Sequence, residues 1–116
     1  MKLDIHRSED TFTITLHEER LDALSSAAFR LRLMECLDAG CRRLVLDLSR
    51  TAFVDSSGLG VLVATLRRLS GPGSLVLRGV TAPVERTLRL ARLDRILVLQ
   101  EAGAPETQEP EPQTPR

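Results

Sequence analysis

Apolar and polar residues alternate in two neighbouring segments at the start of the chain, residues 2–7 and residues 11–17. Alternation places every second side chain on one face of an extended backbone, so each segment is predicted to form a strand. The polar residues 8–10 between them are typical of a tight turn, and the two strands are expected to pair as a hairpin. The alternating apolar residues are Leu3, Ile5, Phe12, Ile14 and Leu16.

A spacing of three or four residues marks residues 24–38 as a helix with one apolar face. The charged residues Arg30, Arg32, Glu35 and Asp38 fall elsewhere around the helical wheel. Gly40 is expected to end the helix, because glycine readily takes the left-handed backbone that often follows a last helical turn. The predicted apolar face consists of Leu24, Ala27, Ala28, Leu31, Met34 and Leu37.

Strands and helices then alternate. Residues 44–48 are almost continuously apolar, as in a strand covered on both faces, and a second helical stripe runs to the Ser-Gly-Pro-Gly turn at residues 70–73. After a short strand at residues 75–77, Thr81 is expected to cap a third helix with Pro83 in its first turn, and residues 96–99 form the last predicted strand. The helical stripes are Leu59, Leu62, Val63, Leu66 and Leu69, and then Val84, Leu88 and Ala91.

This order of elements is typical of an α/β fold with right-handed crossovers. We expect a single domain over residues 1–100, with a mixed sheet of roughly four or five strands packed with at least three helices. Residues 101–116 hold four of the six prolines and four glutamates, without a large apolar side chain. This segment is therefore expected to be a disordered acidic tail.

Composition and charge weigh against several classes of function. The 116 residues carry a net charge of +0 and only 3% are aromatic, whereas single-stranded nucleic-acid binding uses basic grooves and aromatic stacking platforms. Nucleic acid is therefore not an expected partner. The sequence shows neither a signal-peptide pattern nor a run of about eighteen apolar residues, which predicts no membrane span and, by default, a cytoplasmic location.

Candidate catalytic and metal-ligating groups are sparse. Cys36 and Cys41 lack clustered histidines, and they are interpreted as buried thiols rather than as a disulfide or a zinc site. His6 and His17 have no nucleophile or acid at useful spacing, so no enzyme, metal or cofactor is predicted. Four arginines near the third helix are interpreted as a solvated face, with a basic strip for an acidic partner or a membrane surface as the alternative. They are Arg86, Arg89, Arg92 and Arg95.

The hexapeptide Asp55-Ser56-Ser57-Gly58-Leu59-Gly60 joins the end of a strand pattern to the start of the second helix. Taken alone it is typical of a helix cap, in which Ser56 or Ser57 satisfies unpaired backbone N–H groups and Gly58 permits close packing. A helix N-terminus also accommodates phosphate, because free N–H groups and the positive end of the helix dipole meet there. A nucleotide-binding P-loop is disfavoured, since its Lys-Ser/Thr ending is missing.

Four other segments accompany this motif. Together with the hexapeptide they resemble, over residues 1–100, a STAS domain of the anti-sigma factor antagonist type, a family of small bacterial regulators. The segments are Arg20-Leu21-Asp22-Ala23, Leu46-Asp47-Leu48-Ser49, Phe53-Val54 and Leu93-Asp94-Arg95-Ile96. Two positions depart from the family pattern: Glu19 stands where glycine is usual, and Ala91-Arg92 replaces a common Thr-Gly. A glutamate in a turn that needs positive φ would be strained.

The resemblance implies a binding module that is switched by phosphorylation. In the family, a serine-kinase anti-sigma factor with a histidine-kinase-like ATPase fold phosphorylates the serine after the motif aspartate. That position is Ser56 here, with Ser57 as the alternative acceptor. The unmodified antagonist binds the kinase and so frees a sigma factor for transcription, and a cognate phosphatase is a further expected partner.

The resemblance also implies a partner-binding surface made by two turns. It is predicted to contain Asp22, Ser25, Asp55, Ser56, Ser57, Gly58, Leu59 and Gly60. For Asp22 the alternative is a purely structural role as the cap of the first helix. For the whole chain, the alternative function is that of a STAS subunit in a lipid or anion transport complex or a sensing scaffold.

Overall fold

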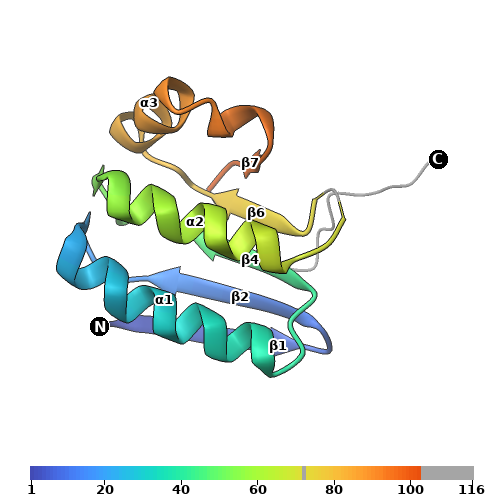
Figure 1. Ribbon diagram of the computed structural model, residues 1–116. Helices are drawn as coiled ribbons and strands as arrows, with labels where there is room; N and C mark the ends of the chain where they lie inside the picture. The colour runs from blue at the N-terminus through green and yellow to red at the C-terminus, as the bar shows by residue number, and fades with distance from the viewer. Residues whose placement is uncertain (72, 103–116) are drawn as a thin grey trace.

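The predicted hairpin and mixed sheet are present in the computed structural model, which describes residues 1–71 and 73–102 (Figure 1). β1 (Leu3–Ser8) and β2 (Thr11–Leu16) pair antiparallel, and β4 (Arg43–Asp47), β6 (Leu75–Arg78) and β7 (Val98–Gln100) extend the sheet in parallel. The order of the five-stranded sheet is β1-β2-β4-β6-β7. Pro72 of the predicted turn and residues 103–116 of the predicted tail lie outside the described residues.

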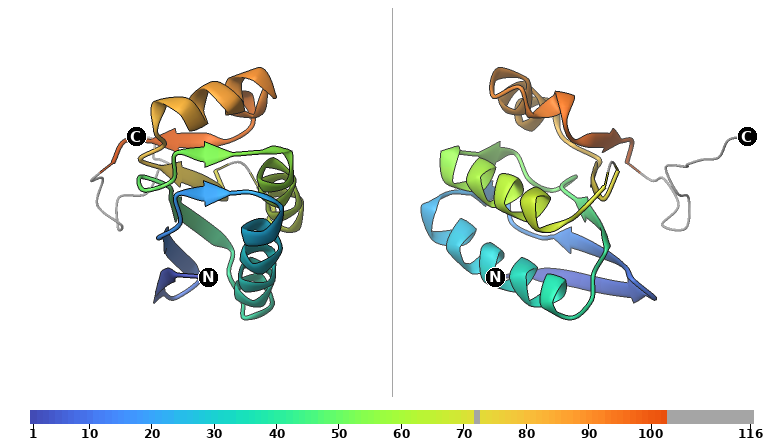
Figure 2. Two further views of the ribbon diagram at one scale, coloured as in Figure 1. Left: turned by 90° about the vertical axis from the view of Figure 1, so that its left-hand side faces the viewer. Right: turned by 45° about the vertical axis from the view of Figure 1, so that its right-hand side comes forward.

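Two helices, α1 (Ala23–Asp38) and α2 (Ser56–Arg68), lie side by side over one face of this sheet (Figure 1; Figure 2). α3 (Ala82–Leu90) and the short 3₁₀ helix η1 (Leu93–Arg95) lie near β7. A second sheet of two parallel strands, β3 (Arg20–Leu21) and β5 (Phe53–Val54), leads into α1 and α2. These two strands and η1 were not predicted, because elements of two or three residues are too short to show a hydrophobic period.

Aliphatic side chains fill the layer between the sheet and the two helices. Ile14, Leu46 and Leu77 are aligned across β2, β4 and β6, and each is fully buried. Phe29 of α1 and Leu62 of α2 belong to the same core. Burying one such side chain stabilises a fold by about 1.5–3 kcal/mol, so this layer holds the strand ends and helix starts in place.

The predicted apolar face of α1 is wrong. Leu24 and Leu31 are 85% and 67% exposed, Ala27 is exposed, and Ala28 and Met34 are only half-buried. Leu37 alone of the predicted set lies in the core, and the residues buried from this helix are Ser26, Phe29, Leu33, Cys36 and Leu37. The helix carries two apolar stripes, and the one with the larger side chains, Phe29 and Leu33, removes more apolar area from water.

Other local predictions are confirmed or corrected at the element ends. Gly40 has φ 101° directly after the α1 C-cap, as predicted for the helix end. The expected alternation of burial is absent in β1, an edge strand: Leu3 is half-buried, Ile5 is 41% exposed, and the other residues of the strand are exposed as well. The last strand begins at Val98 rather than at residue 96, since Ile96 forms the C-cap of η1.

The start of α3 also differs from its prediction. Thr81 occupies the N-cap position, but its hydroxyl donates to the Thr51 carbonyl at 2.8 Å and makes no capping bond. Val84 and Leu88 are buried as predicted, whereas Ala91 is exposed because the helix ends at Leu90. Thr81 therefore ties α3 to the loop after β4 instead of closing the helix end.

Candidate partner-binding site

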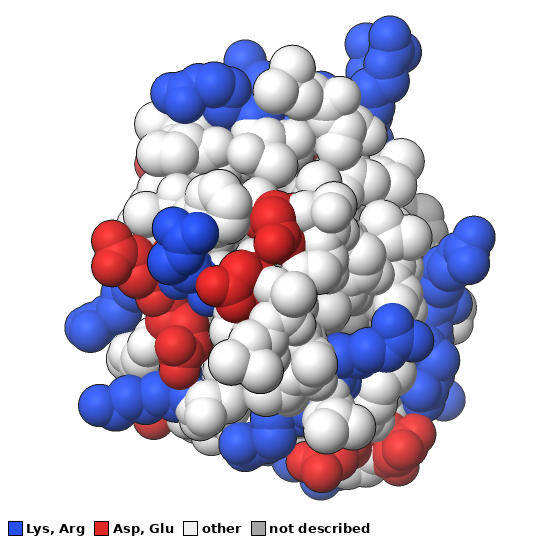
Figure 3. Space-filling view, turned by 60° about the vertical axis from the view of Figure 1, so that its left-hand side comes forward, with Lys and Arg blue, Asp and Glu red and all other residues white. Residues whose placement is uncertain are grey.

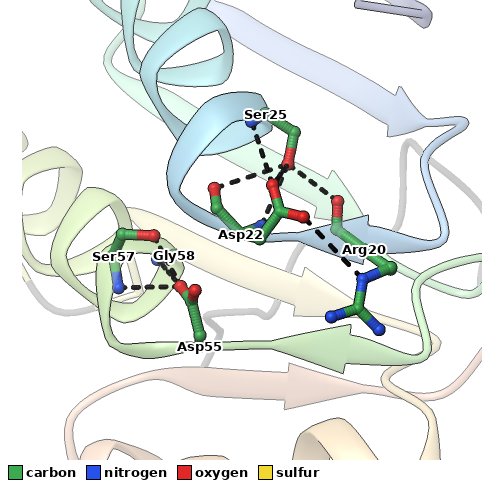
Figure 4. A network of polar contacts seen from close by, with 6 residues as sticks. All are labelled: Arg20, Asp22, Ser25, Asp55, Ser57 and Gly58. Atoms are coloured by element: carbon green, nitrogen blue, oxygen red, sulfur yellow. Dashed lines mark hydrogen bonds and ion pairs between the residues drawn. The ribbon is translucent and has the colours of Figure 1, made fainter.

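The two short strands bring the starts of α1 and α2 together. β3 and β5 pair in parallel with Leu21 opposite Val54, and the Asp55 amide donates to the Leu21 carbonyl at 3.1 Å. Each strand is followed at once by an aspartate that caps a helix, Asp22 for α1 and Asp55 for α2. Figure 4 shows the two caps beside each other, so the predicted partner-binding residues of both turns meet in one region.

Asp22 closes a reciprocal capping box with Ser25. The Ser25 amide donates to Asp22 Oδ1 at 3.2 Å, and the Asp22 amide donates to Ser25 Oγ at 3.0 Å. Ser25 Oγ also donates to the Arg20 carbonyl at 2.8 Å. The backbone and side-chain hydrogen bonds from Ser25, followed by the charge of Arg20, lower the pKa of Asp22 despite some desolvation. Asp22 therefore caps α1, as the alternative predicted, and its place on a partner-binding surface stays a prediction.

Asp55 caps α2 through a single carboxylate oxygen. Oδ1 accepts from the amides of Ser57 at 2.9 Å and Gly58 at 3.2 Å, and also from the Ser57 hydroxyl. The hydroxyl bond is the largest cause that lowers the pKa of Asp55, and the two amides and Arg20 add to it against a smaller effect of burial. The prediction that a serine caps this helix is therefore wrong, because the aspartate one residue earlier supplies the accepting oxygen.

The two adjacent serines have different environments. Ser57 is half-buried, and its hydroxyl is bonded to Asp55. Ser56 is the first residue of α2 and is exposed, and its hydroxyl has no hydrogen-bond partner among residues 1–71 and 73–102. Ser56 therefore presents the more accessible nucleophilic oxygen of the pair.

The glycines of the hexapeptide also differ from each other. A β-carbon on Gly58 would lie 2.7 Å from Val54 Cγ1 and 3.1 Å from both the Leu21 Cβ atom and the Leu21 carbonyl oxygen. Gly58 is buried and permits the close packing that the sequence predicted. Gly60 is exposed, and a β-carbon there would meet nothing within 4 Å, while Leu59 between them is half-buried against the core.

Arg20 is a site residue that the sequence reasoning did not single out. Its guanidinium carbon lies 4.2 Å from the centre of the Phe53 ring, and its Nε lies 3.8 Å from Asp22 Oδ2. Its charge contributes to the lowered pKa of both Asp22 and Asp55. The available signal was positional: Arg20 and Phe53 each stand two residues before a capping aspartate, so a parallel pairing of the turns aligns them.

The two departures from the family pattern have different consequences. Among the described residues, only Glu9 and Arg92 are non-glycine residues with positive φ, so Glu19 is not strained. The Glu19 carbonyl instead accepts from the Ala52 amide at 2.8 Å and from the Phe53 amide at 3.2 Å. Arg92 has φ 62°, a left-handed conformation that favours glycine and costs about 1–2 kcal/mol for other residues.

Charged groups gather around the paired helix starts. Figure 3 shows acidic side chains clustered next to basic ones on this side of the molecule, with uncharged surface beside them. The predicted solvated face near α3 is exposed at all four of its arginines, and Arg89 pairs with Glu85 at 2.7 Å. The four are Arg86, Arg89, Arg92 and Arg95.

Within residues 1–71 and 73–102, no helix is long and apolar enough to cross a bilayer.

A mixed sheet with helices on one face and two paired helix starts is the architecture of a STAS domain. The family model described as "Mlab, STAS domain" matches residues 3–100, and the chain belongs to this family. The family resemblance of the sequence and the predicted fold class are thereby confirmed.

Three solved structures illustrate the similarity. A putative anti-sigma factor antagonist from Thermotoga maritima is 27% identical with a TM-score of 0.74, and the match covers 87% of each chain. An anti-sigma factor antagonist from Mycobacterium paratuberculosis is 20% identical with a TM-score of 0.76, over 85% of this chain and 84% of that one. The Bacillus cell fate determinant SpoIIAA in its phosphorylated form is 18% identical with a TM-score of 0.66, over 84% of this chain and 90% of that one.

Proposed function

We propose that this STAS domain is an anti-sigma factor antagonist that binds a serine-kinase anti-sigma factor in the cytoplasm and is released when Ser56 is phosphorylated. Capture of the kinase frees a sigma factor and so regulates transcription, and a cognate phosphatase restores binding. The observation that carries the proposal is the difference between two neighbouring hydroxyls. Ser56 Oγ is exposed and unbonded among the described residues, whereas Ser57 Oγ is held by Asp55. A kinase needs an oxygen that can enter its active site, which favours Ser56.

The relatives support the same kind of role. Structures of this fold include proteins described as anti-sigma factor antagonists, and one of them, SpoIIAA, is described in a phosphorylated form. A chain with this fold therefore tolerates a phosphate without losing its architecture. The exposure of Ser56 at the first position of α2 supports the same tolerance here.

The electrostatics explain how a phosphate at Ser56 would act on binding. A phosphoserine adds roughly −1.5 to −2 charges at neutral pH. The amides of Ser57 and Gly58, which could otherwise have bonded the phosphate, already donate to Asp55 Oδ1. The new charge would thus lie beside an ionised carboxylate, and an interface fitted to a neutral hydroxyl would bury it without a partner. Binding is lost while the fold is kept.

The test uses the full chain and a candidate anti-sigma kinase of the histidine-kinase-like ATPase fold from the same genome. Incubation with ATP followed by phosphopeptide mass spectrometry should place the phosphate on Ser56. Ser56→Ala should abolish the modification, and the matched control Ser57→Ala should retain it. By calorimetry, Ser56→Ala should bind the kinase like the wild type and Ser56→Asp should bind at least about tenfold more weakly, the loss expected when an unpaired charge is buried at an interface.

Phosphate on Ser57, or equal binding of Ser56→Ala and Ser56→Asp, would contradict the proposal. The alternative function, a STAS subunit of a transport complex or a sensing scaffold, gives a different result in the same experiment. It predicts a stable complex with a transport ATPase that persists in the presence of ATP and leaves both serines unmodified. In that case Asp55 and Ser57 would serve only to begin α2.

A further inference from the structure

The outer face of α1 carries an apolar stripe that no described element covers. Leu24 and Leu31 lie two turns apart on the helix and are 85% and 67% exposed. Ala27 and Ala28 lie between them, the first exposed and the second half-buried. Positions spaced by three, four and seven residues fall on one side of a helix, so these side chains form a continuous strip.

The two ends of this strip have opposite surroundings. The Leu24 end borders an open cleft of about 540 Å³ that Arg20, Leu24, Ser25 and Ala28 line, together with the acidic residues Glu18, Glu19 and Asp22. The Leu31 end is flanked in sequence by two arginines, the exposed Arg30 and the half-buried Arg32, and Arg32 Nε lies 3.6 Å from Glu35 Oε1 one turn further along the helix. One half of the strip is thus a hollow whose rim holds three acidic residues and Arg20, and the other is a leucine beside Arg30 and the Arg32–Glu35 ion pair.

We propose that the outer face of α1 is a homodimer interface in which α1 packs antiparallel against α1 of a second copy. A two-fold axis between Ala27 and Ala28 places Leu24 against the partner's Leu31 and Ala27 against the partner's Ala28. The alanines at the centre allow the helices to approach closely. Leu31 then enters the cleft of the partner subunit, and Arg30 and Arg32 meet its acidic rim.

The self-complementary arrangement is what favours a second copy over an unrelated partner. A two-fold interface needs each feature to be matched by its complement on the same surface, and this strip supplies a hollow with an acidic rim and a leucine with basic flanks. Its apolar part is small against the roughly 800 Å² per partner of a standard interface. The dimer is therefore expected to be weak and concentration-dependent.

This inference goes beyond the proposed function and does not rest on it, although the two surfaces adjoin. Asp22 and Ser25 line the same cleft as Leu24, and they also belong to the predicted partner-binding surface. A second copy seated in the cleft would cover them. Dimerisation would thus compete with binding of the kinase and would lower the concentration of monomer that can bind it.

The test is analytical ultracentrifugation of the full chain between about 10 µM and 1 mM, the range of weak association. The wild type should shift from monomer to dimer over this range. Leu24→Lys and Leu31→Glu each place a charge in the apolar contact between Leu24 of one copy and Leu31 of the other, and Leu31→Glu also meets the acidic rim of the cleft. Each variant should weaken the dimer at least tenfold. Leu90→Glu is the matched control, because Leu90 is 83% exposed on α3, away from the strip, and should change nothing.

The double variant Leu24→Lys/Leu31→Glu tests the antiparallel pairing itself. In the proposed dimer the lysine introduced in each copy faces the glutamate introduced in the other copy, which gives two symmetric ion pairs. Dimerisation should therefore return to within about threefold of the wild type. A chain that stays monomeric up to 1 mM, single variants that dimerise like the wild type, or a double variant that stays as weak as the singles would each overturn the proposal. None of these outcomes changes the expected phosphorylation of Ser56, so the two proposals fail separately.

Discussion

The turns that begin α1 and α2 share one plan and differ in what they leave accessible. Each follows a short parallel strand with an aspartate cap, Asp22 or Asp55. In the first turn, Ser25 returns a bond to the Asp22 amide and closes the capping box. In the second turn, the equivalent position is Gly58, and the Ser57 hydroxyl bonds the Asp55 carboxylate instead.

The difference separates structural capping from a surface available to a partner. Ala23 follows the cap of the first turn and offers no reactive group, while Ser56 follows the second and offers an exposed hydroxyl. The replacement of a capping serine by Gly58 lets α2 pack against Leu21 and Val54 of the paired strands. The second turn is thus anchored by close packing, and Ser56 is left without a structural task.

The largest effect on stability is expected from Gly58→Ala. The added methyl would lie 2.7 Å from Val54 Cγ1 and 3.1 Å from the Leu21 carbonyl oxygen, so the Val54 side chain must shift and the Leu21 backbone must yield slightly. Overpacking of this kind costs about 1–3 kcal/mol of unfolding free energy, which urea denaturation measures. Gly60→Ala is the matched control, because the added methyl would meet nothing within 4 Å. An alanine in place of a glycine inside a helix should stabilise the fold by about 0.5–1 kcal/mol. Equal effects of the two changes would refute the packing role of Gly58.

A smaller effect on unfolding free energy is expected when one serine hydroxyl is removed from each turn. Ser25→Ala removes the bonds to the Asp22 amide and the Arg20 carbonyl and should cost about 1 kcal/mol. Ser56→Ala removes no hydrogen bond seen among the described residues and should stay within about 0.5 kcal/mol of the wild type. Thermal and urea unfolding of both variants make the comparison. A destabilised Ser56→Ala protein would show that Ser56 has a structural task after all.

The smallest expected effect is on the pH dependence of unfolding at acidic pH. The folded pKa of Asp55 lies below its ordinary value of 3.8, so its contribution is present above that value and is lost as pH falls through the folded pKa. Ser57→Ala removes the largest cause of the lowered pKa, which should therefore rise toward 3.8 and move acid unfolding to slightly higher pH. Carboxyl NMR titration measures this change. The pKa of Asp22 serves as the internal control and should stay in place, because Ser25 sets it.

Periodicity predicted the hairpin, the buried β4 and the course of α2, because each runs for several residues with one face toward the core. It failed where length or symmetry removed the signal. β3 and β5 are too short to show a period, and α1 has apolar residues on two sides, so sequence spacing could not decide which stripe meets the sheet. The motif indicated the location of the site, but which oxygen caps α2 and which serine hydroxyl is left unbonded depend on side-chain geometry at Asp55.

The buried thiols bear on how the native protein responds to reactive chemicals. Cys36 near the end of α1 and Cys41 before β4 are free, and desolvation raises both their pKa values, that of Cys41 to about 11. At neutral pH almost no thiolate is present, and thiolate is the form that alkylating agents and oxidants attack. Both sulfurs therefore resist modification while the corner between α1 and β4 stays closed, and their rate of labelling reports how often that corner opens.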